Sequence, residues 1–271
     1  MLKRIALISD IHGNLPALQA VLADLDARAD ITAIYHLGDL TGYAPWPNEV
    51  ISLLRERAIF GIGGNYDSTV ANDYKHCGCR ADSQREEELS HISYEWTREH
   101  VSAETKRFLG ALPFRLDIRP FGGHASGPTI TLIHGNQSLN TVYVTEERAD
   151  EFLQKMAADL GASPGDVIAF GHTHKPWQRV VDGTQFVNAG SVGRPKDHDA
   201  RACYVILSIG HTPPAVEFAR VTYDVERAAN AIRESGLPAD FADVLRSGGT
   251  SGLTAVTELP AEASSPPLRP A

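Results

Sequence analysis

Residues 5–14 read IALISDIHGN, a short apolar run followed at once by polar residues and a glycine. The apolar part, residues 5–8, predicts a buried strand, and Asn14 is a favourable N-cap for a helix with apolar side chains at helical spacing. The alternation continues with strand-like runs at 33–37 and 59–62 and a helical pattern at 47–57. Strands that alternate with helices predict a parallel sheet with helices packed against it.

The pattern changes after the third strand. Residues 67–125 are more polar and contain two helical stretches, 83–98 and 104–112, so we interpret this segment as a helical insertion flanking the sheet. A helical pattern at 225–234 and five strand-like runs follow, at 129–133, 167–170, 184–187, 202–209 and 216–222. The predominance of strands in this half of the chain predicts a second sheet.

The end of the chain differs in composition from the rest. From residue 247 onward glycine, serine, threonine and proline dominate, which predicts a flexible tail over 247–271. We expect the remaining residues, 1–246, to form a single domain, since their number is compatible with one large domain.

The composition argues against several classes of protein. The 271 residues include 25 Lys and Arg against 34 Asp and Glu, and this formal charge of −9 disfavours binding to duplex nucleic acid or an anionic membrane. It permits a small phosphorylated substrate held by metal ions. Three cysteines exclude a secreted disulfide framework, and no apolar run approaches the roughly 20 residues of a membrane span. Because the N-terminal apolar run is too short for a signal peptide, we expect a cytoplasmic protein.

Side chains that can bind metals follow five of the predicted strands closely. They are Asp10, His12, Asp39, Asn65, His134, His172 and His174. Ligands of open α/β sheets bind at the carboxyl ends of the strands, so we expect these side chains to lie together. Carboxylate, amide and imidazole donors favour Mn, Fe, Zn or Ni over Ca or a thiolate-bound metal. Seven ligands exceed the needs of one tetrahedral zinc and are typical of two metals about 3.5–4 Å apart.

The order of these ligands resembles a known family. Five blocks match those of the calcineurin-like metallophosphoesterases in sequence: Asp10-Ile11-His12, Gly38-Asp39, Gly64-Asn65-Tyr66-Asp67, His134-Gly135 and Gly171-His172-Thr173-His174. Residues 188–191, Asn-Ala-Gly-Ser, resemble a further block of that family. The resemblance implies an α/β fold of two mixed β-sheets packed together between outer helices, a four-layer α/β/β/α sandwich.

The resemblance also implies a role for each ligand. Asp10, His12 and His174 would hold one divalent metal ion. Asp39 would bridge it to a second ion, held by Asn65, His134 and His172. Mn²⁺ is the expected ion, with Fe, Zn or Ni as alternatives. A hydroxide bridging the metals would attack phosphorus, so the implied activity is metal-dependent hydrolysis of a phosphoric ester.

One block departs from the common pattern of the family. Many members have a histidine after the asparagine, thought to protonate the leaving group, but this chain has Tyr66 there and keeps Asp67, the usual partner of that histidine. A phenol with a pKa near 10 is a poor proton donor at neutral pH. The chain therefore resembles the small bacterial and archaeal phosphodiesterases that lack the histidine, which favours diesters over monoesters. In the alternative interpretation Tyr66 only packs, and another histidine supplies the proton: His76, His124 or His198.

Three residues are candidates for substrate contacts. Arg194 and Lys196 lie shortly after the block at 188–191, and the alternative is that both are solvated loop charges. Trp46 follows Asp39 closely and is a candidate for stacking on a base, with ordinary packing as the alternative. No arginine follows Asp39 in residues 38–45, which disfavours a Ser/Thr protein phosphatase.

Three functions remain to be distinguished. The leading hypothesis is a two-metal phosphodiesterase that acts on a small, nucleotide-type substrate. The alternative is a phosphomonoesterase or dinucleoside-polyphosphate hydrolase on the same site. A non-catalytic, metal-binding scaffold is a weaker alternative, because none of the seven ligands is missing. The sequence leaves the physiological substrate, the native metal and the oligomeric state open.

The motif His76-Cys77-Gly78-Cys79 allows three interpretations. It is half of a zinc site, an oxidation-sensitive thiol pair, or a glycine turn with two small side chains. No second ligand pair accompanies the motif, which disfavours the zinc interpretation. The role of Cys77 and Cys79 stays open at this point.

Overall fold

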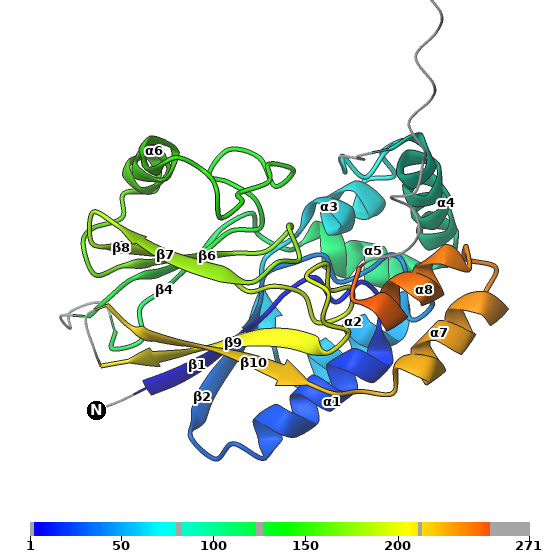
Figure 1. Cartoon of the computed structure of the whole chain (residues 1–271), viewed down its shortest axis with the longest axis horizontal. Helices are drawn as coiled ribbons and strands as arrows, with labels where there is room; N and C mark the ends of the chain where they lie inside the picture. Colours follow the sequence, from blue (N-terminus) through cyan, green and yellow to red (C-terminus); the bar gives the residue numbers. More distant parts are fainter. Residues whose placement is uncertain (1–2, 80–82, 123–126, 211–212, 250–271) are drawn as a thin grey trace, which may run out of the picture.

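The structure is a computed structural model that describes residues 3–79, 83–122, 127–210 and 213–249. Two β-sheets of five strands each pack face to face, and helices cover their outer faces (Figure 1). This arrangement confirms the α/β fold of two mixed sheets between helices that the resemblance implies.

The first sheet contains the N-terminal strands and the last two strands of the chain, in the order β10-β9-β1-β2-β3. β1 (Lys3–Ile8), β2 (Ile31–His36) and β3 (Phe60–Gly61) run parallel. β9 (Ala202–Ile209) pairs antiparallel with β1, and β10 (Ala215–Val221) pairs antiparallel with β9. The sheet is therefore mixed, with its parallel half formed by the N-terminal alternation of strand and helix.

The second sheet lies between β3 and β9 in the chain and has the order β4-β5-β6-β8-β7. Its three inner strands, β5 (Ile130–Leu132), β6 (Val167–Phe170) and β8 (Thr184–Asn188), run parallel. The edge strands β4 (Leu116–Ile118) and β7 (Trp177–Val181) are antiparallel to their neighbours. The second sheet predicted from the strand-rich half is thus confirmed.

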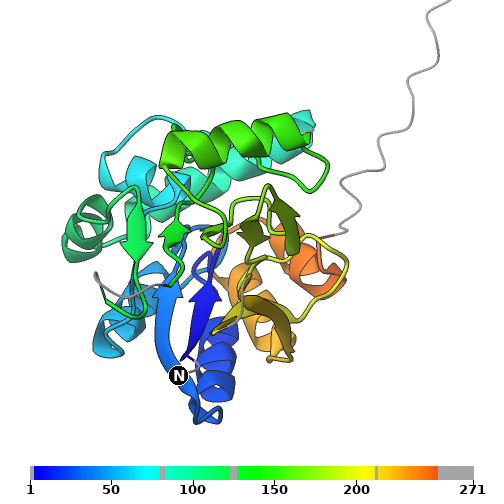
Figure 2. The same ribbon diagram turned by 90° about the vertical axis from the view of Figure 1, so that its left-hand side faces the viewer.

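The described residues contain eight helices: α1 (Leu15–Asp26), α2 (Pro47–Glu56), α3 (Asn65–Ala71), α4 (Gln84–His100), α5 (Ala103–Gly110), α6 (Asp150–Leu160), α7 (Val225–Glu234) and α8 (Asp240–Ser247). α1 contacts β9 and β10 of the first sheet, whereas α6 contacts β7 of the second. The turned view shows these two helices, blue and green, on opposite sides of the sheets (Figure 2). No helix of the described residues has the length and apolar character that a membrane span requires.

Alternate residues of the central strands contribute to two different cores. In β1, Ile5 and Leu7 pack in the core between the sheets, whereas Ala6 and Ile8 pack against the helices. All four are buried, and burial of each large apolar side chain stabilises the fold by about 1.5–3 kcal/mol. A strand covered on both faces requires an uninterrupted apolar run, which is the pattern at residues 5–8.

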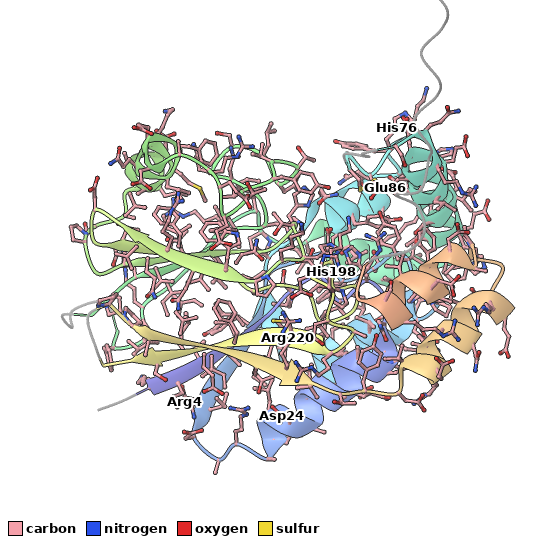
Figure 3. The ribbon with its side chains drawn as sticks, in the orientation of Figure 1. Arg4, Asp24, His76, Glu86, His198 and Arg220 are labelled. Carbon is pink, nitrogen blue, oxygen red and sulfur yellow. A yellow bond between two sulfur atoms is a disulfide. The ribbon has the colours of Figure 1, made fainter. Side chains whose placement is uncertain are left out.

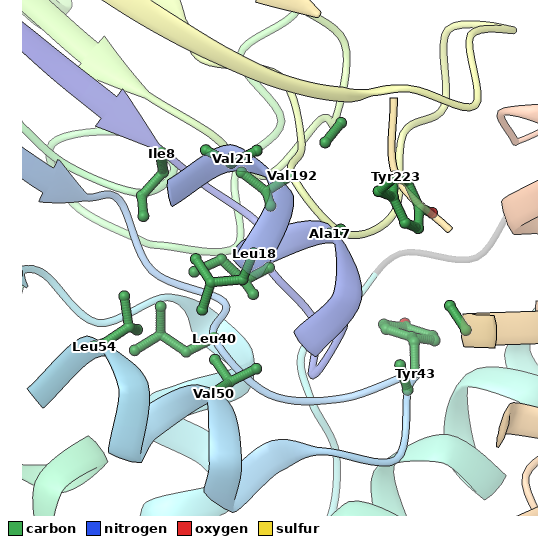
Figure 4. Packing of buried hydrophobic residues seen from close by; sticks show 14 of the residues in the cluster. Ile8, Ala17, Leu18, Val21, Leu40, Tyr43, Val50, Leu54, Val192 and Tyr223 are labelled. Atoms are coloured by element: carbon green, nitrogen blue, oxygen red, sulfur yellow. The ribbon is translucent and has the colours of Figure 1, made fainter. Parts of the chain in front are cut away.

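The core on the helix side joins α1 to α2 (Figure 4). Leu18 and Val21 of α1 lie with Leu40, Val50 and Leu54, and all five side chains are buried. This packing holds the loop after β1 beside the loop after β2. The ends of these strands carry the first predicted metal ligands.

The segment 67–125 is only partly helical. It contains α4 and α5, but it ends in β4, which pairs with β5 as an edge strand of the second sheet. β4 has three residues, too few for its sequence to show a strand pattern. Of the predicted tail, residues 250–271 lie outside the described part of the chain.

Candidate metal centre

The seven predicted ligands come together where strands of both sheets end. Asp10 and His12 follow β1, Asp39 follows β2, and Asn65 begins α3 after β3. The second sheet supplies His134, His172 and His174, which follow β5 and β6. Each ligand residue is at most 4 % exposed. Packing the sheets face to face therefore joins two sets of strand ends into one buried cluster of polar side chains.

The first group of ligands consists of Asp10, His12 and His174. Asp10 Oδ1 lies 3.3 Å from His174 Nε2 and 3.8 Å from His12 Nε2. The two imidazole Nε2 atoms are 3.1 Å apart. These three residues can offer one ligand atom each to a metal ion, with all of these atoms within 4.8 Å of one another.

The second group consists of Asp39, His134 and His172, which meet the same distance condition. Asn65 belongs beside them, because its Oδ1 lies 3.2 Å from His134 Nε2. The Asn65 amide nitrogen donates to the backbone carbonyl of Cys77 at 2.9 Å, and this hydrogen bond turns Oδ1 toward the ligands.

Asp39 lies between the two groups. Its Oδ2 is 3.3 Å from Nε2 of His134 in one group and 3.9 Å from Nε2 of His12 in the other. Although burial opposes both shifts, His134 lowers the pKa of Asp39 and Asp39 raises the pKa of His134 to about 10. The carboxylate is thus the negative charge around which both groups are arranged.

Backbone carbonyls orient three of the imidazoles. His12 Nδ1 donates to Thr41 O at 3.0 Å, and His134 Nδ1 donates to Leu37 O at 2.7 Å. His174 Nδ1 donates to the backbone carbonyl of residue 194 at 2.6 Å. A carbonyl can only accept, so each of these Nδ1 atoms carries a proton. His12 and His174 are neutral because burial lowers their pKa values, so their Nε2 atoms present lone pairs to the cluster, as in metal-binding histidines. His134, whose pKa Asp39 raises, carries a second proton on Nε2 that a metal ion would replace.

Five of the seven ligands have left-handed backbone conformations, which are uncommon for residues other than glycine. These φ values lie between 49° and 67° and belong to Asp10, His12, Asp39, His172 and His174. Backbone strain of this kind persists only where the surrounding structure enforces it, and it concentrates at functional sites. The strand ends are therefore bent in order to direct these side chains into the cluster.

The polar atoms of the cluster fit divalent metal ions. Asp10 Oδ1 and His172 Nε2 are buried and have no hydrogen-bond partner in the structure. Leaving such atoms unpaired costs about 1–3 kcal/mol each, and a metal ion removes this cost. Burial lowers the pKa values of His12 and His172 to about 3, so these imidazoles are in the neutral form that binds metals.

Residues 188–191 are hydrogen-bonded to the loops that carry the metal ligands. Asn188 Nδ2 donates to Gly171 O at 2.8 Å and to Thr173 Oγ1 at 3.0 Å, in the loop that carries His172 and His174. Ser191 Oγ donates to Asp10 O at 2.7 Å. In the sequence, Asn188 and Ser191 are indicated by the block Asn-Ala-Gly-Ser at 188–191, which resembles a block of the family.

An open cleft lies over the cluster and is lined by several of its residues. Besides ligands, its lining includes the apolar residues Tyr43, Leu89 and Phe241 and the charged residues Glu86, Arg194 and Lys196. The two cations proposed from the sequence as substrate contacts thus face the same cleft as the metal ligands. Tyr143 also lines it, with its ring centroid 4.1 Å from that of His172.

Arg194 is a buried cation in the wall of this cleft. Only 6 % of the residue is exposed, and its Nε has no hydrogen-bond partner. The guanidinium lies over the ring of Tyr43, 4.0 Å from its centroid. Lys196 differs, because its ammonium nitrogen is 3.7 Å from a carboxylate oxygen of Glu86 on α4 (Figure 3).

Trp46 lies away from the cleft. It is the residue before α2 and packs, partly buried, against the core between the first sheet and its helices. It is absent from the described lining of the cleft. Pro47 starts the helix directly after it, so the indole follows the helix into this packing. The described indole thus packs in the core, and stacking of Trp46 on a base stays a prediction.

Tyr66 and Asp67 are also absent from the described lining of the cleft, and the Tyr66 ring packs beneath it against the rings of His12 and Tyr43, at centroid distances of 5.9 and 5.3 Å. Tyr66 is fully buried, and its hydroxyl is hydrogen-bonded to Ser93 Oγ at 2.9 Å. Burial raises the pKa of this phenol well above its usual value. Asp67 accepts hydrogen bonds from the backbone N–H groups of Leu40 and Gly64, at 2.9 and 3.0 Å. It thereby connects the loops that carry the ligands 39 and 65, and none of the described histidines is hydrogen-bonded to it.

Two of the alternative proton donors also lie elsewhere. His76 and His198 are exposed and do not belong to the described lining of the cleft (Figure 3). His124 falls outside the described residues.

The two neighbouring cysteines form a disulfide, Cys77–Cys79, at the edge of the site. Cys79 lines the cleft, and the carbonyl of Cys77 accepts the hydrogen bond from Asn65. Of the three interpretations of this motif, the structure contains the oxidised pair. The zinc interpretation requires free thiolates, and the disulfide leaves none here.

The comparisons with known proteins agree with this geometry. Residues 4–212 match the calcineurin-like phosphoesterase superfamily domain. An uncharacterized protein from Methanocaldococcus jannaschii is 30% identical over 253 residues, which cover 86% of this chain and 93% of that protein. A metallophosphoesterase structure from Sphaerobacter thermophilus has 26% identity and a TM-score of 0.71, with 92% of this chain and all of that one (100%) covered. A hypothetical protein from Pyrococcus horikoshii has the same fold, with 20% identity, a TM-score of 0.75 and coverage of 91% and 98%. The match over most of its length shows that the chain belongs to the calcineurin-like phosphoesterase superfamily.

Proposed function

We propose that this phosphoesterase hydrolyses the phosphodiester bond of a small, nucleotide-type substrate and that it does so with two divalent metal ions. Membership in the superfamily supports the general class, a metal-dependent phosphoric ester hydrolase. The number of ions, the preference for a diester and the type of substrate are the parts that we propose.

In this proposal each group of ligands holds one ion. Asp10, His12 and His174 bind the first, while Asn65, His134 and His172 bind the second. Asp39, which lies between the two groups, would hold both ions. Mn²⁺ is the ion we favour, with Fe, Zn or Ni as alternatives for this donor set. When bound, such ions activate water near neutral pH and take up negative charge on the phosphoryl oxygens.

The charge of the cleft wall is the observation that carries the preference for a diester. Arg194 has no carboxylate within ion-pair distance among the described residues, whereas Lys196 is paired with Glu86. Counted over its described residues, the wall therefore adds one positive charge in excess to the metal site. A phosphodiester carries one negative charge, whereas a monoester carries about 1.5 to 2 at pH 7. A guanidinium can also bind two phosphate oxygens at once, which orients the ester.

None of the described residues that the sequence suggests as a proton donor lies in the cleft, which supports the same preference. The Tyr66 hydroxyl is bound to Ser93, and the Asp67 carboxylate is bound to backbone N–H groups. The histidines that line the cleft are all in the ligand set. We therefore expect turnover to depend strongly on how well the leaving group departs without a proton from the protein.

The apolar part of the cleft favours a substrate with an organic substituent. Tyr43, Leu89 and Phe241 line the cleft together with Arg194, so an ester held by the guanidinium has an apolar surface beside it. Rings such as a nucleobase pack well against surfaces of this kind. A phosphodiester has two organic substituents, whereas a monoester has one, so a diester can place one substituent on this apolar surface while the other departs.

The test is a comparison of initial rates on bis-p-nitrophenyl phosphate and p-nitrophenyl phosphate, with Mn²⁺ present and after addition of EDTA. We expect metal-dependent hydrolysis that is faster for the diester. Faster hydrolysis of the monoester would overturn the preference for diesters. A protein that neither binds Mn²⁺ nor cleaves either ester would instead be a scaffold with a vestigial site.

A further inference from the structure

We propose that Phe241 of α8 is a positioning residue for Arg194, so that the C-terminal helices α7 and α8 complete the phosphate-binding wall of the cleft. This inference rests on the proposed function, in which Arg194 holds the phosphate of the substrate. Both helices follow residue 212, where the match to the superfamily domain ends. They therefore lie outside the part of the chain that matches the superfamily domain.

Aromatic faces hold the Arg194 guanidinium in place. Its Cζ lies 4.0 Å from the ring centroid of Tyr43 and 5.8 Å from that of Phe241. Its backbone N–H donates to Ser191 Oγ at 2.8 Å, which fixes the main chain but not the end of the side chain. Among the described residues, no hydrogen bond or ion pair holds the guanidinium. The rings thus determine where this charge points while its polar edge stays available to an anion.

Phe241 also holds the nearer ring. The rings of Tyr43 and Phe241 meet edge to face, with centroids 5.2 Å apart and an interplanar angle of 85°. The backbone N–H and the hydroxyl of Tyr43 are hydrogen-bonded to Ser93 and Ser90 of α4. Tyr43 is therefore supported by α4 on one side and by α8 on the other. Loss of the Phe241 ring leaves the tyrosine without its support from α8.

α8 is attached to the loop that carries Arg194. His198 donates its backbone N–H to the carbonyl of Gly248, the residue that ends α8, at 2.9 Å. A small cavity borders Arg194, with Phe241 and Leu245 among its other lining residues. Removing the phenyl ring enlarges this cavity, so the arginine side chain can turn back from the cleft.

The test is a double-mutant cycle on the full chain loaded with Mn²⁺, with binding of inorganic phosphate measured by calorimetry. The variants are Phe241→Leu, Arg194→Ala and the double variant. Loss of one cation–π contact predicts that Phe241→Leu raises the Kd of phosphate by about 2- to 30-fold. In the Arg194→Ala background we expect the same substitution to change Kd by less than about twofold, because Phe241 acts through the guanidinium.

Two further variants separate positioning from packing. Phe241→Tyr keeps the ring and should bind phosphate like the wild type. Val244→Ala removes buried apolar mass from the same helix, away from the described lining of either cavity, and should leave the Kd unchanged. If Phe241→Leu does not fold, Phe241→Met replaces it in the cycle, since methionine fills an apolar site without a ring.

The outcomes are distinct. An equal effect of the Phe241 substitution with and without Arg194, no effect at all, or a wild type that does not bind phosphate would each overturn the proposal. The cycle requires no turnover, so it decides the role of Phe241 even if the enzyme prefers monoesters. Faster hydrolysis of monoesters would overturn only the proposed diester specificity and not the role of Phe241.

Discussion

A Cβ atom on Gly64 would lie 2.0 Å from Oδ1 of Asp39 and 2.4 Å from the backbone nitrogen of Asp39. The same oxygen accepts a hydrogen bond from the backbone N–H of Tyr66 at 2.9 Å. The loop after β3 thus lies directly against the carboxylate that stands between the two ligand groups. Only a residue without a side chain fits at position 64, which explains the glycine there in terms of contact distances.

We therefore predict that Gly64→Ala displaces Asp39 and lowers both metal affinity and activity. The contact to the backbone nitrogen prevents relief by rotation of the Asp39 side chain alone. Mn²⁺ titration and the rate on bis-p-nitrophenyl phosphate measure the effect. Gly110→Ala is the control, because a Cβ there meets only Ala71, at an ordinary distance of 3.5 Å. If Gly64→Ala binds Mn²⁺ like the wild type, the described closeness of the two loops is incorrect.

Substitution of the ligands themselves should abolish turnover without unfolding the protein. Loss of an outer partner of a metal ligand costs 10- to 100-fold in affinity or activity, so we expect more than about 100-fold for Asp39→Asn and for His134→Ala. The circular dichroism spectrum should be unchanged, because both side chains lie outside the three apolar cores. Full activity in either variant would contradict the assignment of the site.

Tyr66→Phe should leave the rate on the diester within about twofold of the wild-type value, since the phenol does not reach the cleft. The substitution removes the hydrogen bond to Ser93, and we expect a loss of about 0.5–1.5 kcal/mol in the free energy of unfolding. Denaturant titration and steady-state rates measure the two effects separately. A tenfold or greater fall in kcat with unchanged metal content would mean that Tyr66 takes part in catalysis.

Much of the fold is predictable because several strands are buried on both faces. β6 and β9 have the predicted bounds, since covered strands appear as continuous apolar runs. β7 was not predicted, because it is an edge strand whose Gln178 is exposed and interrupts the apolar pattern. α3 was missed because its first residue, Asn65, belongs to a motif that also marks the end of a strand.

The metal ligands and the wall of the cleft also differ in how far the sequence predicts them. Each metal ligand closely follows one of five strands, so local sequence indicates its position, and the structure brings these residues together. The wall formed by Arg194, Tyr43 and Phe241 depends on α7 and α8 folding back onto the cleft. No local pattern predicts such a contact between distant segments. Sequence reasoning therefore missed Phe241 and left Arg194 undecided.

The loop that carries Arg194 and Lys196 should show a pH-dependent contribution to stability. A hydrogen bond from Arg201 lowers the pKa of Asp199 to about 2, and Asp197 is paired with Arg220 of β10 (Figure 3). Because the folded-state pKa is below the unfolded value of about 3.9, this contribution is present above pH 4 and is lost as the pH falls toward 2.

Asp199→Asn should therefore lower the thermal midpoint at pH 7, by an amount that corresponds to about 1 kcal/mol or less for such a partly exposed pair. The difference from the wild type should shrink between about pH 5 and pH 2. Asp182→Asn, on the exposed turn between β7 and β8, serves as the control. A difference that stays constant over this range would show that the ion pair does not support the loop.

The most direct test of the central claim is the number of Mn²⁺ ions bound per chain, measured by calorimetric titration of metal-free protein and by elemental analysis after dialysis. The two ligand groups on either side of Asp39 predict two ions per wild-type chain and a loss of bound metal in Asp39→Asn. One ion per chain, or none, in the wild type would contradict the account of a dinuclear phosphoesterase.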